Sequence, residues 1–87
     1  MVRPKILWMK VGPDPDTGDE WESYVGHVLC KRDGVIRTVA MVEFDLCLDM
    51  WAWHLIGSGI GHMGYENDIP TAKDMAELSW LNYGVLP

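Results

Sequence analysis

Alternating apolar and polar residues predict a series of short strands along most of the chain. Runs rich in β-branched and aromatic residues, which are typical of strands, lie at Ser23–Cys30 and Val35–Phe44. Asp33-Gly34 lies between them and is a strong signal for the turn of a β-hairpin. A run at Lys5–Val11 precedes this hairpin, and a run at Leu48–Ile56 follows it. We therefore expect four antiparallel strands.

The side chains on the two faces of the predicted strands indicate where the core lies. Alternate side chains of a strand point to the same face. In the second hairpin strand this rule groups an almost wholly apolar set, which we expect to face the core: Ile36, Thr38, Ala40, Val42 and Phe44. The Leu48–Ile56 strand has apolar residues on both faces, with Trp51 and Trp53 together on one of them. That pattern predicts a central strand or one covered on both sides.

The end of the chain has helical periodicity. Apolar residues recur at helical spacing from Ala72 to Tyr83, and we expect a helix over about residues 71–83. Thr71 and Asp74 have the spacing of a capping box at its start, and Gly84 is placed to end it. The expected fold is therefore a single α+β domain over residues 1–87, a four-stranded antiparallel β-meander with one C-terminal α-helix packed on one face.

Two loops contain motif-like sequences. The glycine-rich loop 57–64 includes Gly59, Gly61 and Gly64, which match the G-x-G-x-x-G dinucleotide fingerprint. The fingerprint requires its third glycine inside a helix of a β-α-β unit, whereas here an extended piece, His62–Glu66, precedes the helix. We interpret the loop as a turn. The acidic loop 12–22 resembles the start of a calcium loop but has Gly18 at the fifth, ligating position, which leaves only weak Ca²⁺ binding open.

The sequence shows no assembled catalytic or metal-binding set. His27 and Cys30 are three positions apart on one strand, so they point to opposite faces. We expect Cys30 and Cys47 to be two buried thiols, as in a protein of a reducing cytoplasm. A cysteine–histidine pair formed only in the fold stays open. We predict no cofactor and no enzymatic activity.

Charge is distributed unevenly along the chain. The net charge is −6, and all of it comes from residues 38–87, which hold seven acidic residues and the single base Lys73. Such a surface repels phosphate backbones and attracts basic proteins. We therefore expect no direct nucleic-acid partner. The opening residues lack the apolar stretch of a signal peptide, and no run is long enough to span a bilayer, so a cytoplasmic protein without a membrane partner is expected.

Aromatic residues provide the best indication of a binding surface. The chain has five tryptophans in 87 residues, and one helix can cover only one face of the expected sheet. Large apolar side chains on the other face must then be exposed, and such a patch marks a binding surface or a dimer interface. The candidate interaction residues are Trp51, Trp53, His62, Met63, Tyr65, Glu66, Asp68, Asp74 and Glu77.

In size, charge and build the chain resembles the small acidic proteins that phages and mobile elements carry, the anti-CRISPR proteins among them. The resemblance rests on no motif and implies no functional residue. The small size, the missing catalytic set and the acidic half with its surplus aromatic residues favour an inhibitor or adaptor that docks an acidic, aromatic-anchored face on a basic surface of a larger protein. If that surface normally binds nucleic acid, the module would act as a competitive inhibitor. The alternatives are a structural protein that forms homodimers or larger homo-oligomers, such as a minor phage component, and a small metal-binding or Cys/His enzyme.

Overall fold

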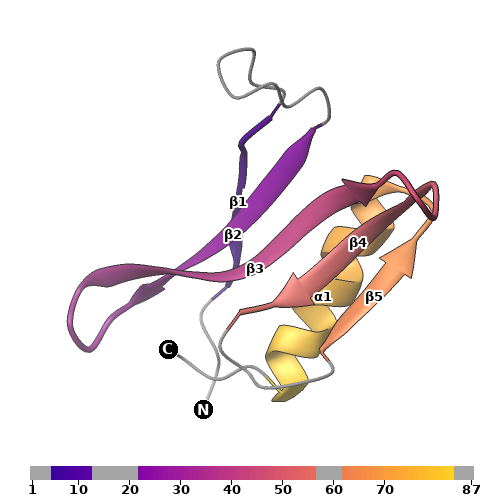
Figure 1. The fold of residues 1–87 in the computed structure, drawn as a ribbon. Helices are drawn as coiled ribbons and strands as arrows, with labels where there is room; N and C mark the ends of the chain where they lie inside the picture. Colours follow the sequence, from indigo (N-terminus) through magenta and orange to yellow (C-terminus); the bar gives the residue numbers. More distant parts are fainter. Residues whose placement is uncertain (1–4, 13–21, 57–61, 84–87) are drawn as a thin grey trace.

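The computed structural model of the protein describes residues 5–12, 22–56 and 62–83. They form five strands followed by one helix (Figure 1). All neighbouring strands are antiparallel and follow one another in sequence order, so the sheet is a meander. The predicted α+β class with one C-terminal helix is confirmed. The elements are β1 (Leu7–Lys10), β2 (Ser23–Cys30), β3 (Val35–Asp45), β4 (Met50–Leu55), β5 (Met63–Glu66) and α1 (Ile69–Tyr83).

The number of strands differs from the prediction. The extended piece at His62–Glu66 contributes a fifth strand, β5, which pairs with β4 from Trp51↔Glu66 to His54↔Met63. A strand of four residues that includes a glycine is too short for a recognisable alternating pattern. Gly64 therefore lies in a strand and not in a helix as the dinucleotide fingerprint requires. Gly59, Gly61 and the rest of the motif before His62 are outside the described residues.

The predicted hairpin is confirmed in β2 and β3. Residues 31–34 form its turn, and Gly34 adopts the left-handed φ of 71° that a glycine takes without strain. The Asp33 carboxylate accepts a hydrogen bond of 3.0 Å from the Val35 backbone N–H. Among the described residues, β1 pairs with β2 only as far as His27, and β4 pairs with β3 only as far back as Ala40. The hairpin end therefore projects from the sheet (Figure 1).

A β-bulge changes which side of β3 faces the core. Gly26 pairs with Ala40 but His27 pairs with Thr38, so Val39 is the extra residue on β3. Val39 and Ala40 are both fully buried. The prediction that Ile36 and Thr38 share the core face with Ala40 is wrong, because the bulge reverses the alternation before residue 39. Ile36 is 66% exposed.

The helix begins two residues earlier than predicted. The Asp68 side chain accepts a hydrogen bond of 2.7 Å from the Thr71 N–H, and the Asp68 carbonyl accepts one from Ala72 N–H. Asp68 is therefore the N-cap, and Thr71 occupies the third helical position. The Thr71–Asp74 capping box is wrong, because Asp68 offers the same type of cap and Pro70 is tolerated in the first turn.

The helix lies across β3, β4 and β5 and covers one face of the sheet (Figure 1). Its buried residues include Ala72 and Ala76, whose small side chains allow the helix to approach the strands closely, and Trp80, which fills the space beside them. The core cluster consists of Ile6, Val28, Cys30, Val39, Ala40, Val42, Trp53, Leu55, Ala72, Ala76 and Trp80. The buried stripe is narrower than the predicted apolar arc, since Leu78 and Tyr83 are 52% and 60% exposed.

Candidate protein-binding surface

The strand registers define a second face of the sheet, opposite the helix, on which no described element packs. Residues directly opposite one another on paired strands share a face. One row crosses all five strands on this side: Met9, Val25, Met41, His54 and Met63. We call this side of the sheet the open face.

The open face is apolar and rich in methionine. Four of the six methionines of the chain lie on it: Met9, Met41, Met50 and Met63. Met50 is on this face because it lies two rows from His54 on the same side of β4. Methionine is unbranched and polarisable, and it adapts to the shape of a partner. Other large apolar side chains on this face are strongly exposed: Leu7 at 64%, Leu29 at 47%, Ile36 at 66% and Tyr65 at 39%. Monomeric proteins rarely leave such a patch uncovered without a binding role.

Two histidines lie within this apolar surface, on strands on either side of β3. His27 Nδ1 and the Thr38 hydroxyl form a hydrogen bond of 3.0 Å, which fixes the positions of both side chains on the sheet. His54 is directly opposite Met41 and Met63, and it has no side-chain hydrogen bond among the described residues. Both histidines are half-buried.

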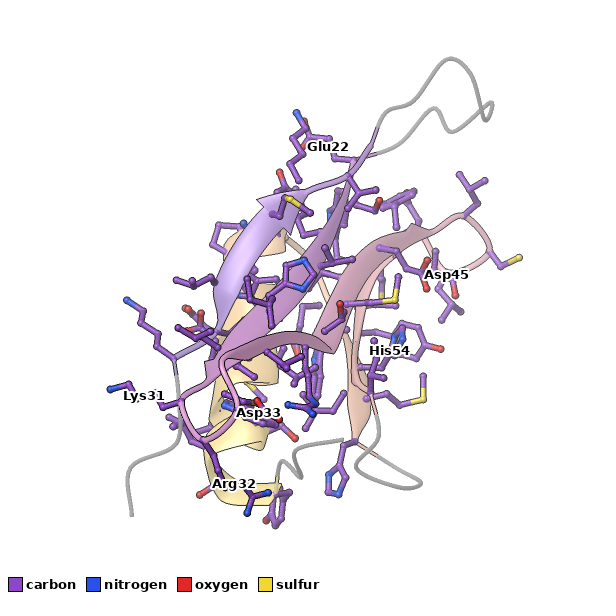
Figure 2. The ribbon with its side chains drawn as sticks, turned by 90° about the vertical axis from the view of Figure 1, so that its left-hand side faces the viewer. Glu22, Lys31, Arg32, Asp33, Asp45 and His54 are labelled. Carbon is purple, nitrogen blue, oxygen red and sulfur yellow. The ribbon has the colours of Figure 1, made fainter. Side chains whose placement is uncertain are left out.

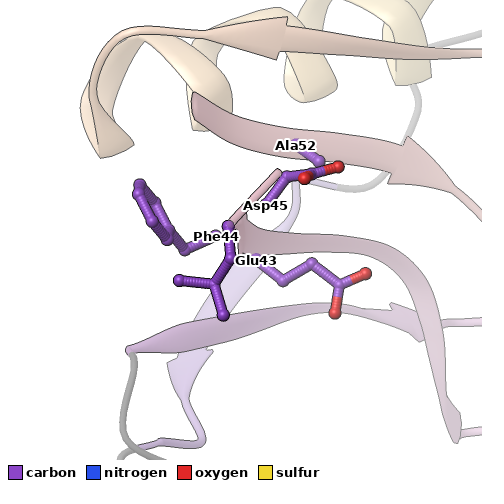
Figure 3. Close-up of a pocket in the computed structure, with 5 residues that line it drawn as sticks. Glu43, Phe44, Asp45 and Ala52 are labelled. Atoms are coloured by element: carbon purple, nitrogen blue, oxygen red, sulfur yellow. The ribbon is translucent and has the colours of Figure 1, made fainter. Parts of the chain in front are cut away.

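One end of the open face is acidic. Glu43 and Asp45 lie there beside Ala52 and line a shallow hollow of about 290 Å³ (Figure 3). Asp45 also stabilises the β3–β4 turn, because its carboxylate accepts hydrogen bonds from the Cys47 and Leu48 N–H groups at 2.9 and 3.1 Å. Asp49 completes the turn with a left-handed φ of 54°.

The other end of β3 is the basic hairpin turn. Lys31 and Arg32 are exposed there, whereas Asp45 lies at the far end of the same strand (Figure 2). Arg37 forms an ion pair of 3.0 Å with Asp33. The hydrogen bond from this guanidinium lowers the pKa of Asp33, with help from the Val35 N–H, and raises that of Arg37. The long axis of β3 therefore connects an acidic end to a basic one.

The predicted tryptophan anchors face the helix. Trp53 is 94% buried in the core, where its indole packs against Gly64 of β5. Trp51 is half-buried and packs edge-to-face on Phe44, with ring centroids 5.2 Å apart. The structure therefore places Trp51 and Trp53 under the helix and away from the open face.

The remaining predicted residues are divided between the two sides. Met63 and Tyr65 lie on the open face. His62 stacks on Tyr83 of the helix at 4.9 Å, on the covered side. The four predicted acidic residues all lie on the covered side of the sheet or on the helix. Asp68 is the N-cap, and Asp74 is exposed. Glu66 pairs with Trp51, and Glu77 accepts a hydrogen bond of 2.7 Å from Trp8 Nε1.

A network of side chains joins β1 and β2 to the helix. The Lys73 ammonium lies 3.8 Å from the ring centroid of Tyr24, whose hydroxyl donates to Glu22 at 2.8 Å. Lys10 forms an exposed ion pair with the same carboxylate at 3.2 Å. The hydrogen bond from Tyr24, with a smaller contribution from Lys10, lowers the pKa of Glu22, and the same bond raises the pKa of Tyr24. The contact between Lys73 and Tyr24 therefore connects the helix to β2 on the side of the sheet away from the open face.

The cysteines and histidines do not assemble into a site in the described part of the chain. Cys30 is buried in the core, whereas Cys47 is exposed in the β3–β4 turn, so the prediction of two buried thiols is wrong for Cys47. His27 and Cys30 point to opposite sides of β2, as predicted. No group of three or more His, Cys, Asp or Glu side chains that could hold a metal ion is found among these residues. The candidate calcium loop is outside the described residues.

Most residues of the open face were missed from the sequence. The alternation in Lys5–Val11 places Leu7 and Met9 on one face and Trp8 on the other, and this signal could have found the first strand of the face. The hairpin turn alone would have paired Val25 with Ala40, and the bulge at Val39 is what places Val25 opposite Met41. The residues that β4 contributes to the open face could not be identified from the sequence, because β4 has no polar face and only the position of the helix shows which of its sides is covered.

Comparisons with known proteins add no family to this description. No protein-family model matches the chain, and no curated protein and no solved structure matches it significantly. No helix among the described residues is long and apolar enough to cross a membrane.

Proposed function

We propose that the protein is a non-enzymatic protein-binding module of the cytoplasm, an inhibitor or adaptor, which docks its open face on a larger protein. The observation that supports this most is the uncovered, methionine-rich sheet face itself. Exposed apolar side chains lower the solubility of a small domain, and a partner protein that covers them explains why they are there. The partner is expected to present an apolar patch with basic groups at one end, complementary to Glu43 and Asp45.

The size of the open face suits such an interface. Five strands about 4.8 Å apart make a surface roughly 20 Å wide. Together with strand lengths of four to eleven residues, this width gives a contact of roughly 500–600 Å² per partner, near the low end of specific interfaces. Contacts from the hairpin turn or from the acidic end would extend it.

Charge supports a basic partner over a second copy. With a net charge of −6, the protein is attracted over long range to basic surfaces, and the attraction speeds association. A second copy carries the same net charge, which opposes association. If the partner's basic surface normally grips nucleic acid, the carboxylates of this module take the place of phosphates and the module competes with the nucleic acid.

The proposal is tested by affinity capture from a lysate of the cells that express the protein, followed by binding measurements with the captured protein after purification. Raising the salt concentration from about 50 to about 500 mM should weaken binding, because screening shortens the reach of the charges. Glu43→Lys should weaken it at least about tenfold, because the new charge repels basic groups at the acidic end of the open face. Asp74→Lys makes the same change on the helix side and serves as the matched control.

A homodimer through the open face is the second candidate, since a second copy would also cover the exposed methionines. Sedimentation at micromolar concentration separates the two. A monomer that binds a captured basic protein, with Glu43→Lys weaker than Asp74→Lys, supports the proposal. A stable dimer with no specific capture, or equal losses from the two reversals, overturns it.

A further inference from the structure

The middle of the open face brings together three side chains that share one type of metal chemistry. Met41 on β3 is directly opposite His54 on β4, and His54 is directly opposite Met63 on β5. The three residues are therefore neighbours in a single row, with the imidazole between two thioethers. They are far apart in the sequence, and no spacing motif would have indicated them.

The row has dimensions that allow its three donor atoms to converge. Directly opposite residues of antiparallel strands have Cβ atoms about 4.5–5.5 Å apart. Each methionine has three rotatable bonds, so its sulfur can swing over the imidazole from either side. Met63 is 51% exposed, and Met41 and His54 are half-buried, so a small ion can reach all three.

The imidazole of His54, unlike that of His27, is available as a metal ligand. His27 is engaged with Thr38 through its Nδ1, whereas His54 has no side-chain hydrogen bond among the described residues. The next row of this face holds Glu43, Ala52 and Tyr65, so its carboxylate and hydroxyl lie outside the row of His54. The immediate donor set is therefore two sulfurs and one nitrogen, without an oxygen.

We propose that Met41, His54 and Met63 form a binding site for a soft monovalent metal ion, Cu(I), with Ag(I) as its redox-stable analogue. Thioether sulfur selects soft ions, and imidazole is a good ligand of copper. Ions such as Ca²⁺ and Mg²⁺ require oxygen ligands, which this row lacks, and structural zinc sites are built from thiolate and imidazole. The inference is independent of the proposed docking, because it needs only the isolated protein.

The test must separate this row from the exposed thiol of Cys47, since thiolates bind the same ions. The full chain with Cys47→Ser, labelled with ¹³C at the methionine methyl groups, is titrated with Ag(I). The methyl resonances of Met41 and Met63 should shift together and saturate at one equivalent. Those of Met9 and Met50, on the same face, and of Met75, on the helix, serve as internal controls and should stay in place.

Two further variants show whether the imidazole is a ligand. His54→Gln should lower the Ag(I) affinity at least about tenfold, the scale on which even the loss of an outer-shell partner acts. Met9→Leu, a similar surface change two strands away from Met41, should leave it unchanged. Circular dichroism of each variant confirms that the fold is retained. Equal shifts of all methionine methyls, an affinity unaffected by His54→Gln, or the absence of a shift at Met41 and Met63 would overturn the proposal.

Discussion

The indole of Trp53 packs directly against Gly64 on the neighbouring strand. A Cβ atom at position 64 would lie 2.6 Å from Trp53 Nε1 and 2.8 Å from its Cε2. The indole N–H has no hydrogen-bond partner among the described residues, so packing alone holds the ring there. The glycine that completes an apparent nucleotide motif is thus explained by the space that a core tryptophan needs.

Gly64→Ala should therefore destabilise the protein by about 1–3 kcal/mol, the usual cost of overpacking a core, because the rigid ring must shift. Unfolding in urea measures the change. Gly34→Asn is the control, since asparagine tolerates the left-handed backbone there and nothing lies within 4 Å of the added Cβ. Equal stability of Gly64→Ala and the wild type would contradict the packing described for Trp53.

The hydrogen bond from Trp8 Nε1 to Glu77 should couple β1 to the helix by about 1.5–3 kcal/mol, the range for a bond to a charged acceptor. A double-mutant cycle of Trp8→Phe and Glu77→Ala, followed by urea unfolding, measures this coupling. The cycle of Trp8→Phe with Asp74→Ala is the control. Because Asp74 is exposed and one turn away from Glu77, that cycle should be additive to within about 0.5 kcal/mol.

Asp68 should make stability depend on pH through the helix cap. The hydrogen bonds from the Thr71 hydroxyl and N–H lower the pKa of Asp68 below its ordinary value. The ionised cap therefore contributes its full stability above the unfolded-state pKa, and this contribution is lost as the pH falls through the lower folded-state value. Thermal unfolding between pH 7 and pH 2 measures the effect. Asp68→Asn keeps an acceptor oxygen but does not titrate, so its melting temperature should approach or exceed that of the wild type at low pH. A constant difference across the range would contradict this prediction.

The two thiols should react at very different rates. Cys47 is exposed in the β3–β4 turn, whereas Cys30 is 95% buried in the core. Under native conditions iodoacetamide should modify Cys47 and leave Cys30 protected until the protein is unfolded in urea. Mass spectrometry of peptides from the modified protein identifies the site. Modification of both cysteines at similar rates would show that the β2–β3 hairpin opens readily.

The sequence predicted those parts of the fold whose signals are local. Asp33-Gly34 determines the hairpin turn because glycine accepts the left-handed conformation at position 34. The helical spacing from Ala72 onward is likewise a property of neighbouring residues. The exact start of the helix was missed because Asp68 and Thr71 are both good N-caps, and only the backbone shows which one caps.

The binding surface was harder to predict because it depends on contacts between strands. The bulge at Val39 reverses the faces of β3, and neither Val39 nor Ala40 is polar enough to reveal it. Trp53 was assigned to a surface because β4 has no polar face. Only the pairing of Trp53 with Gly64 shows that the ring needs space on the helix side.

The methionine methyl groups report directly on whether the open face is the docking surface. The partner obtained by affinity capture is added to protein labelled with ¹³C at these methyls. The resonances of Met9, Met41, Met50 and Met63 should broaden or shift, while that of Met75 on the helix should stay unchanged. Perturbation of Met75 with the four open-face methyls unaffected would contradict docking through the open face and place the interface on the helix side.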